Sequence, residues 1–262
     1  IMSVTYNYHA HTWRCSHASG TEEAYIREAI AGGIPHMGFS DHAPFLFPDG
    51  QESYYRIPMA QARDYFDTLN ALREKYSAQI NIQIGFEMEY YPSFFPAMLN
   101  TARSLGCEYL ILGQHFSGDE RPKGFYVANP TDDPALLKEY VTNVLTAMKT
   151  GLFSYVAHPD IFNFTGAETV YEEEMRKLCV AARELNIPLE INFLGMRAKR
   201  HYPQDRFWRL AGEEGAPVTF GYDSHDVEGA CDSASLPHAL ELVKRYSLNY
   251  IGQPKLILLQ DR

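Results

Sequence analysis

Two histidines, His9 and His11, stand two positions apart where the first apolar run of the chain ends. Residues at i and i+2 of a β-strand point to the same face, so the two imidazoles would lie side by side. Imidazole is the commonest metal ligand in proteins, and two on one face can chelate one divalent ion. Asp223 and His225 repeat this spacing late in the chain. Either pair alone is also consistent with ordinary polar residues at a strand end, but the repetition favours a metal site.

Metal-binding residue types also occur where most of the other apolar runs end. Of the ten histidines, six fall within about one residue of a predicted strand end, and His17 lies in the first loop. The residues of this kind are His9, His11, His17, Asp41, His42, Glu87, His115, His158, Asp223 and His225. The set exceeds what one ion needs, so we expect two or three ions and at least one bridging carboxylate. Nitrogen and oxygen ligands favour Zn, Mn or Fe over Ca, and adjacent ions are typical of phosphoester hydrolysis.

The elements that would position these residues alternate between strand and helix. The predicted strands span 4–8, 34–40, 80–86, 109–113, 153–157, 188–191 and 218–222. Helical spacing is found after Thr21 up to Gly32 and over 59–76, 93–105, 134–150, 172–185, 204–214 and 236–246, whereas 248–251 is too short to assign. This alternation predicts an α/β fold with a parallel sheet and right-handed crossovers.

The distribution of the polar residues favours a barrel over an open sheet. An open doubly wound sheet usually concentrates its site at one switch point and often carries a glycine-rich phosphate loop, and no GxGxxG or P-loop motif is present. A barrel gathers residues from the carboxyl ends of many strands into one site. The length of 262 residues suits a single α/β barrel, and no break in composition divides it. We therefore expect one domain over 1–262.

Several further residues are candidates for contact with a substrate. Arg197 follows the sixth predicted strand, where it is able to hold a phosphate bidentately, and Arg14 and Ser16 lie in the first loop. Glu89, two positions after Glu87, is either a surface charge or the partner of a cationic amine. Two long loops, 43–58 and 117–134, resemble functional lids. Aromatic residues in and beside them, Phe116 included, would enclose a substrate ring or simply pack the lid.

Charge and cysteine content narrow the function classes. The net charge of −10, from 23 basic and 33 acidic residues, argues against general binding of nucleic acids or membranes. A phosphorylated small molecule remains compatible because bound metal inverts the local potential. No apolar run approaches the roughly 20 residues of a membrane span. The four scattered cysteines form no CxxC motif, which indicates free thiols and a cytoplasmic location. The oligomeric state is not predicted.

Taken together, the spaced motifs resemble the PHP (polymerase and histidinol phosphatase) family, and within it the histidinol-phosphate phosphatases. The resemblance extends from residue 8 to residue 225. Its motifs are His-Ala-His-Thr at 9–12, Ser-Asp-His at 40–42 and Asp-Ser-His at 223–225, with His17, Glu87, His115 and His158 between them. It implies a distorted TIM-like (β/α)7 barrel. It also implies hydrolysis of L-histidinol phosphate to L-histidinol and phosphate in histidine biosynthesis.

The resemblance further implies a trinuclear site. One ion would take His9, His11, Glu87 and Asp223; a second would take Glu87, His115 and His158; a third would take His17, His42 and His225. Glu87 would bridge the first two. A water activated between the ions would attack phosphorus in line.

Two roles beside the ligands stay open at this level. Asp41 would either orient a histidine or bind metal directly. The leaving alkoxide needs a proton, and Asp160, two residues after His158, is placed to supply it directly or through water. His42 is the other candidate for this role if it is not a ligand.

Three alternatives differ from this reading in substrate or class. A related phosphoesterase would act on another phosphomonoester or on a phosphodiester. A non-catalytic metal-binding barrel would lack some of the ligands, and none is missing from the set. A metal-dependent amidohydrolase shares the HxH start but usually brings a lysine between its metals, and no lysine stands at a predicted strand end.

Overall fold

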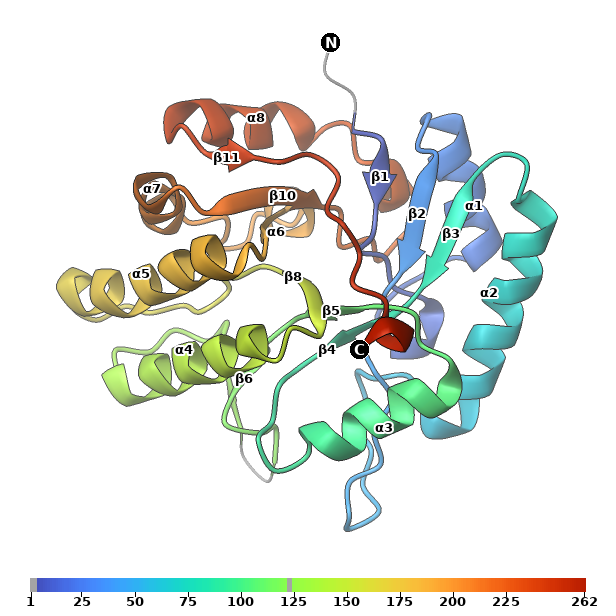
Figure 1. Cartoon of the computed structure of the whole chain (residues 1–262), viewed down its shortest axis with the longest axis horizontal. Helices are drawn as coiled ribbons and strands as arrows, with labels where there is room; N and C mark the ends of the chain where they lie inside the picture. Colours follow the sequence, from blue (N-terminus) through green and yellow to red (C-terminus); the bar gives the residue numbers. More distant parts are fainter. Residues whose placement is uncertain (1–3, 122–123) are drawn as a thin grey trace.

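The computed structural model describes residues 4–121 and 124–262, and it places parallel strands inside a surround of helices (Figure 1). One sheet has the order β1–β2–β3, with β1 Tyr6–Asn7, β2 His36–Phe39 and β3 Asn81–Ile84. The other has the order β11–β10–β9–β8–β5–β4, with β11 Asn249–Tyr250, β10 Pro217–Gly221, β9 Leu189–Asn192, β8 Phe153–Val156, β5 Leu110–Leu112 and β4 Phe86–Met88. All pairs within these two sheets are parallel, as the alternation of strands and helices predicts.

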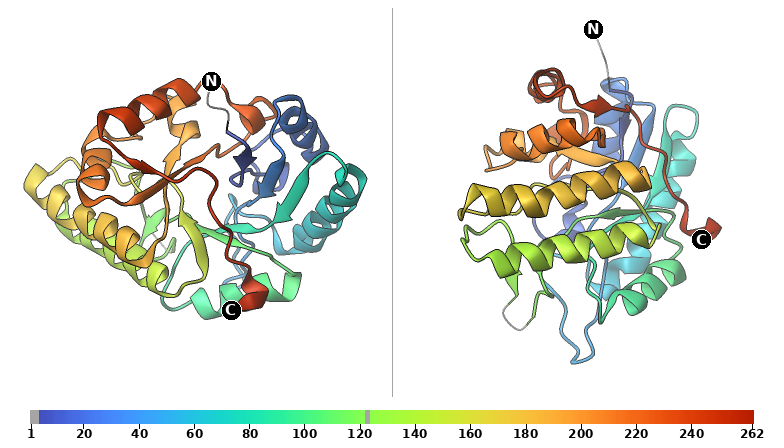
Figure 2. Two further views of the ribbon diagram at one scale, coloured as in Figure 1. Left: turned by 45° about the horizontal axis from the view of Figure 1, so that its top comes forward. Right: turned by 60° about the vertical axis from the view of Figure 1, so that its left-hand side comes forward.

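Helices connect successive strands and cover the outer side of the sheets; α4, α5 and α7 lie side by side (Figure 2). Their bounds are α1 Glu22–Ala31, α2 Ala62–Tyr76, α3 Phe95–Leu105, α4 Pro134–Lys149, α5 Glu168–Leu185, α6 Phe193–Arg197, α7 Asp205–Glu214 and α8 Leu236–Arg245. Local signals set their ends. The Thr21 hydroxyl accepts from the amide of Ala24 at the start of α1, and the Asp133 carboxylate accepts from the amide of Ala135 at the start of α4. In the described parts of the chain, every helix is too short or too polar to cross a membrane.

The predicted strand 80–86 is wrong in one respect, because the structure divides it into β3 and β4. Apolar residues stand at every second position from Ile80 to Phe86, but the hydrogen-bonding partner of the segment changes at Gly85. The Gly85 amide donates to the carbonyl of Phe39 in the first sheet, and the Phe86 amide donates to the carbonyl of Tyr109, next to β5. This segment therefore joins the two sheets.

The seam between β1 and β10, where the first sheet meets the second again, is held differently. This difference distorts the barrel. Near the amino end of β10, β11 pairs with Pro217 and Val218. Farther along, the Phe220 amide donates to the Tyr6 hydroxyl rather than to a strand. At the carboxyl ends a parallel bridge joins Ala10 to Ser224. Within the described residues β1 and β10 share no continuous ladder. The predicted α/β fold with parallel sheets is confirmed, and the TIM-like barrel is open at this seam.

Three smaller elements escape the sequence patterns. The short helix α6 lies between the predicted strand 188–191 and the predicted helix 204–214, and the strands β6 Phe116–Ser117 and β7 Phe125–Tyr126 form an antiparallel pair where a loop was expected. A two-residue strand is too short to show a period. The loop 117–134 and the loop 43–58 meet, because the Ser53, Tyr55 and Arg56 side chains all contact the Glu120 carboxylate. The two long loops therefore fasten to each other at one edge of the barrel mouth.

Candidate metal centre

The carboxyl ends of the strands meet around a cavity of about 720 Å³. Predicted ligands that line it are His17, His42, Glu87, His115, His158, Asp223 and His225. His9, His11 and Asp41 lie below them and are fully buried. The ten predicted ligand residues thus converge on one place, although they come from strand ends spread over more than two hundred positions.

A first group of donor atoms surrounds the space between His9, His11 and Asp223. Asp223 Oδ1 lies 3.4 Å from His9 Nε2 and 3.2 Å from His11 Nε2. Glu87 Oε2 is 3.7 Å and 3.5 Å from the same two nitrogens. The four side chains that the family resemblance assigns to one ion are therefore neighbours.

A second group uses the other oxygen of Glu87. Its Oε1 lies 2.8 Å from His158 Nε2 and 3.4 Å from His115 Nε2. Since Oε2 faces His9 and His11, the two oxygens of this carboxylate face different imidazole groups. This is the arrangement that a bridging carboxylate requires.

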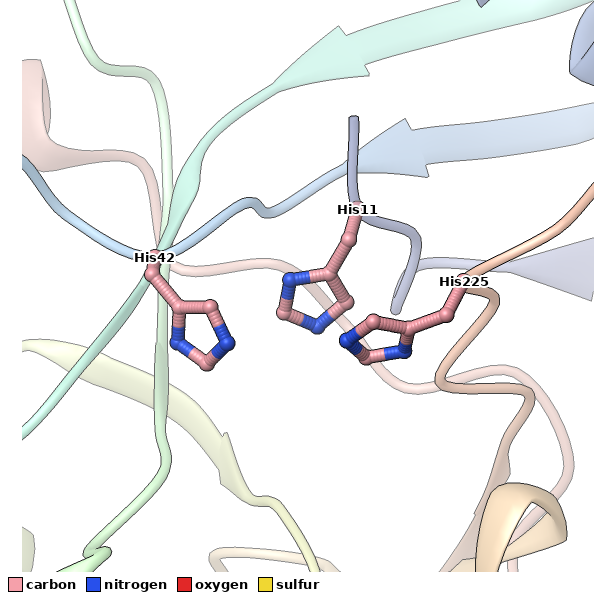
Figure 3. A group of neighbouring side chains, drawn as sticks. All are labelled: His11, His42 and His225. Carbon is pink, nitrogen blue, oxygen red and sulfur yellow. The ribbon is translucent and has the colours of Figure 1, made fainter. Parts of the chain in front are cut away.

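A third group consists of His11, His42 and His225, whose rings face one another (Figure 3). The ring centroids of His11 and His225 are 4.1 Å apart, and those of His11 and His42 are 4.5 Å apart. His17 lies next to this group, with its ring 4.8 Å from that of His225 and its Nδ1 2.7 Å from the Cys15 carbonyl. His17 Nε2 takes no part in the hydrogen bond with Cys15.

Unpartnered buried atoms show that the residues fit divalent ions. His9 Nε2, His11 Nε2, His42 Nδ1 and Asp223 Oδ1 are buried, and none has a hydrogen-bond partner in the described part of the protein. Burying such atoms unsatisfied is costly. Asp223 Oδ1 lies 3.2–3.4 Å from the two nitrogens of His9 and His11, so one cation there would satisfy three of these atoms at once.

The local field also favours positive charge. Burial lowers the pKa of His9, but the carboxylates of Asp223, Glu190 and Glu87 outweigh it and raise the pKa to about 10. Burial raises the pKa of Glu87, yet neighbouring imidazoles, chiefly those of His115 and His42, hold it well below its usual value. A field that retains a proton on a buried imidazole also attracts a metal ion.

For His17, His42 and His225 the surroundings favour the neutral imidazole, the form that binds metal. Burial and the nearby His11 lower the pKa of His42 well below its ordinary value and also lower the pKa of His225. Burial and His225 lower the pKa of His17 to about 4. For His42 this favours a ligand over a proton donor, because an imidazole of low pKa carries no proton to give at neutral pH.

Three buried carboxylates lie behind metal-facing histidines. Asp41 Oδ1 is 3.2 Å from His11 Nδ1, and its Oδ2 accepts from the Thr12 amide and hydroxyl. Glu89 Oε1 is 2.7 Å from His115 Nδ1. Such contacts fix the tautomer and direct the other ring nitrogen toward a metal. Asp41 is therefore placed to orient His11.

The third carboxylate, Glu190, was missed by the sequence reasoning. It lies within β9, and its Oε2 is 2.8 Å from His9 Nδ1 while its Oε1 accepts from the His158 amide and from Asn192. A Cβ on Gly221 would come within 1.9 Å of this carboxylate, so glycine leaves room for it. A lone acidic residue inside an apolar run was the available signal.

Some of the residues predicted to contact the substrate do not line the cavity. Arg14 is buried against Glu22 and Asp64 and does not line the cavity. Ser16 is exposed and likewise absent from the lining. Glu89 is buried between His115 and Arg56, which does not support its predicted contact with a substrate amine. Phe116, in contrast, lines the cavity.

Arg200 lines the cavity, whereas Arg197, the arginine predicted to hold phosphate, does not. The Arg200 guanidinium donates to the Tyr202 hydroxyl at 2.8 Å. Arg197 follows β9 as expected, but it donates to the carbonyls of Tyr222 and Asp223 and to the Asp232 carboxylate. The sequence cannot separate two arginines three positions apart, because the short helix α6 decides which one faces inward.

Asp160 is fully buried and does not line the cavity. Its Oδ2 accepts from the Gln204 amide at 2.6 Å and from the Trp208 indole at 3.0 Å. Burial raises its pKa to about 7. The raised pKa matches an acid, but the contacts face α7, and this position does not support direct proton transfer to a leaving group.

Comparison with known proteins identifies the family of this chain. Residues 7–193 match the PHP domain family model. A probable histidinol-phosphatase of Deinococcus radiodurans is 26% identical over 225 residues, covering 83% of this chain and 85% of the relative. The histidinol-phosphatase of Bacillus subtilis is 26% identical over 255 residues, with coverages of 84% and 92%.

Solved structures agree on the fold. The crystal structure of histidinol phosphate phosphatase from Lactococcus lactis, complexed with zinc, L-histidinol and phosphate, superposes with a TM-score of 0.71. It is 21% identical, covering 95% of this chain and 96% of that one. The family match spans most of the chain and includes the ligand residues from His9 to His158. This protein belongs to the PHP domain family.

Proposed function

We propose that this protein is a metal-dependent phosphomonoesterase that hydrolyses L-histidinol phosphate to L-histidinol and phosphate, a step of histidine biosynthesis. The observation that carries the proposal is the convergence of imidazoles on the two oxygens of one buried carboxylate, Glu87. The relatives from Deinococcus radiodurans and Bacillus subtilis that cover most of the chain are named for this activity. The free thiols agree with a cytoplasmic enzyme.

The proposed centre holds three divalent ions, which are zinc, manganese or iron. The first would be held by His9, His11, Glu87 and Asp223, the second by Glu87, His115 and His158, and the third by His17, His42 and His225. Bound ions of this kind supply an activated water and offset the charge that develops on the phosphoryl oxygens. The chain's own contribution is to fix the ligands, through Glu190 behind His9 and Asp41 behind His11.

Arg200 is the proposed phosphate-binding side chain. It lines the cavity, and its contact with the Tyr202 hydroxyl orients the guanidinium while leaving further N–H groups free for an oxyanion. A planar guanidinium holds two phosphoryl oxygens at once, which restrains the ester in one orientation. This role replaces the one predicted for Arg197.

The rest of the cavity suits the organic part of the substrate. Its volume falls in the range of small-molecule sites. Aromatic side chains of its lining are Tyr54, Tyr55, Phe116, Tyr126 and Tyr202. Such rings stack on a planar imidazole and stabilise a nearby ammonium group. Histidinol phosphate carries both groups.

The test is a kinetic panel on the purified protein supplied separately with Zn²⁺, Mn²⁺ and Fe²⁺. The substrates are L-histidinol phosphate, sugar phosphates, amino-alcohol phosphates and a bis-aryl phosphodiester. We expect kcat/KM for L-histidinol phosphate to exceed that for the other esters by at least about tenfold. Equal values would refute the assigned substrate, and preferential cleavage of the diester would make the protein a phosphodiesterase.

A further inference from the structure

Arg197 ends the short helix α6, and its side chain is largely buried beside the metal centre. Its Nη1 donates to the carbonyl of Tyr222 at 2.9 Å and to the Asp232 carboxylate at 2.9 Å. Its Nη2 donates to the carbonyl of Asp223 at 3.2 Å. The guanidinium thus binds the carbonyls of two consecutive residues, Tyr222 and Asp223. Asp223 is a predicted metal ligand.

The backbone of Asp223 needs such support. Its φ of +47° lies in the left-handed region, which non-glycine residues rarely adopt. Strained backbone of this kind persists only where the surroundings impose it. The conformation directs Oδ1 toward His9 Nε2 and His11 Nε2, while Oδ2 accepts from Asn192 at 3.0 Å. Asn192 fixes the carboxylate, and Arg197 fixes the main chain that carries it.

The residues around the Arg197 guanidinium leave room for it and match its charge. A Cβ on Gly229 would lie 3.1 Å from Arg197 Nη2, so a larger residue there would crowd the guanidinium. Asp232, which neutralises Arg197, is itself buried and accepts from the amide and hydroxyl of Ser235. The charge of Arg197 is therefore matched inside the protein, away from the cavity that a phosphate would enter.

We propose that Arg197 is a positioning residue that holds Asp223 in its metal-binding conformation and does not contact substrate. The proposal rests on the proposed metal centre. It assigns the two neighbouring arginines separate tasks. Arg200 acts on the phosphoryl group from the cavity, and Arg197 acts on the ligand Asp223 from behind.

The test compares Arg197→Lys and Arg197→Met with Arg200→Met, and with Arg183→Met on the outer face of α5 as the matched control. Zn²⁺ affinity is measured on the full chain by competition with a chromophoric chelator, and kcat and KM are measured at limiting and at saturating Zn²⁺. We expect Arg197→Met to weaken the binding of one equivalent of Zn²⁺ by about 10- to 100-fold. Arg197→Lys keeps the positive charge but loses the forked guanidinium, so its Zn²⁺ affinity should fall less than that of Arg197→Met.

Kinetics separate positioning from substrate contact. For the Arg197 variants, activity lost at limiting Zn²⁺ should return at saturating Zn²⁺ with KM unchanged, whereas Arg200→Met should raise KM and leave Zn²⁺ affinity intact. Unchanged Zn²⁺ affinity in both Arg197 variants, with KM raised, would overturn the proposal. If Arg197→Met fails to fold, Arg197→Lys decides in the same way. Failure of the wild-type protein to bind any of Zn²⁺, Mn²⁺ and Fe²⁺ would instead refute the proposed function.

Discussion

Replacing the buried acid Asp160 by asparagine has a calculable effect on stability. Burial raises the pKa of Asp160 from the ordinary 3.8 to about 7. The folded protein therefore holds a proton that the unfolded chain releases, and the resulting stability is complete below pH 3.8 and lost as the pH rises through about 7. Between pH 5 and pH 8 the two pKa values correspond to a loss of about 2.5 kcal/mol in the free energy of unfolding. Asparagine does not titrate and escapes this loss.

The assay is urea unfolding of wild-type protein and Asp160→Asn at pH 5 and pH 8, with the same metal concentration throughout. Costs of the substitution that do not depend on pH cancel when the two differences are compared. We expect the variant to gain about 2.5 kcal/mol on the wild type as the pH rises from 5 to 8. A stability difference that stays constant over this range would show that the carboxyl group does not titrate there, and the inferred burial effect would be wrong.

The same variant tests the catalytic role predicted for Asp160. Its carboxyl group contacts Gln204 and Trp208 instead of the cavity. We therefore expect the pH profile of kcat to keep its shape in Asp160→Asn. A direct general acid would be worth about 10²- to 10⁴-fold in rate, so a fall of that size with a lost pH limb would restore the original prediction.

Three further predictions concern the residues around the cavity. Glu190→Gln removes the negative charge 2.8 Å from His9 Nδ1 and should weaken metal binding about 10- to 100-fold by chelator competition, whereas Glu173→Gln on the exposed face of α5 should not; equal affinities would rule out the supporting role. Glu120→Gln should make the free energy of unfolding depend less on pH between pH 5 and pH 2. Burial raises the pKa of Glu120, but Arg56 and neighbouring hydroxyls lower it to about 2, so stability present above pH 4.5 is lost as the pH falls toward 2, by at most about 3 kcal/mol. Parallel curves for variant and wild type between pH 5 and pH 2 would contradict this. Arg200→Met should raise KM for L-histidinol phosphate about tenfold or more in initial-rate assays, and an unchanged KM would remove Arg200 from the phosphate site.

The gathering of the ligand residues is predictable from the sequence because of a simple property of parallel barrels. His9, His158 and Asp223 each follow an apolar strand, and Glu87 lies in the short strand β4. Parallel strands present their carboxyl ends on one side. Spacing alone thus places residues that are far apart in the chain around one mouth. The strand and helix alternation follows from periodicity in the same way.

The features that were not predicted from the sequence depend on tertiary contacts that no local sequence pattern encodes. Glu190 belongs to the site because β9 faces the barrel interior beside His9, which only the strand order reveals. The division of the third predicted strand at Gly85 depends on its two partners, Phe39 and Tyr109. The position of Arg197 away from the cavity depends on the turn of α6, which this residue ends. In each case a tertiary contact decides between residues that the sequence leaves equivalent.

The most direct test of the central claim is the metal content and turnover of Glu87→Ala beside the wild type and Glu173→Ala. Metal is counted by inductively coupled plasma mass spectrometry after dialysis, and turnover is measured with L-histidinol phosphate. Glu87 faces two imidazole groups with its two oxygens, so we expect the wild type and the control to hold about three ions and the variant to lose at least one of them, together with turnover. Full metal content and unchanged turnover in Glu87→Ala would contradict the account.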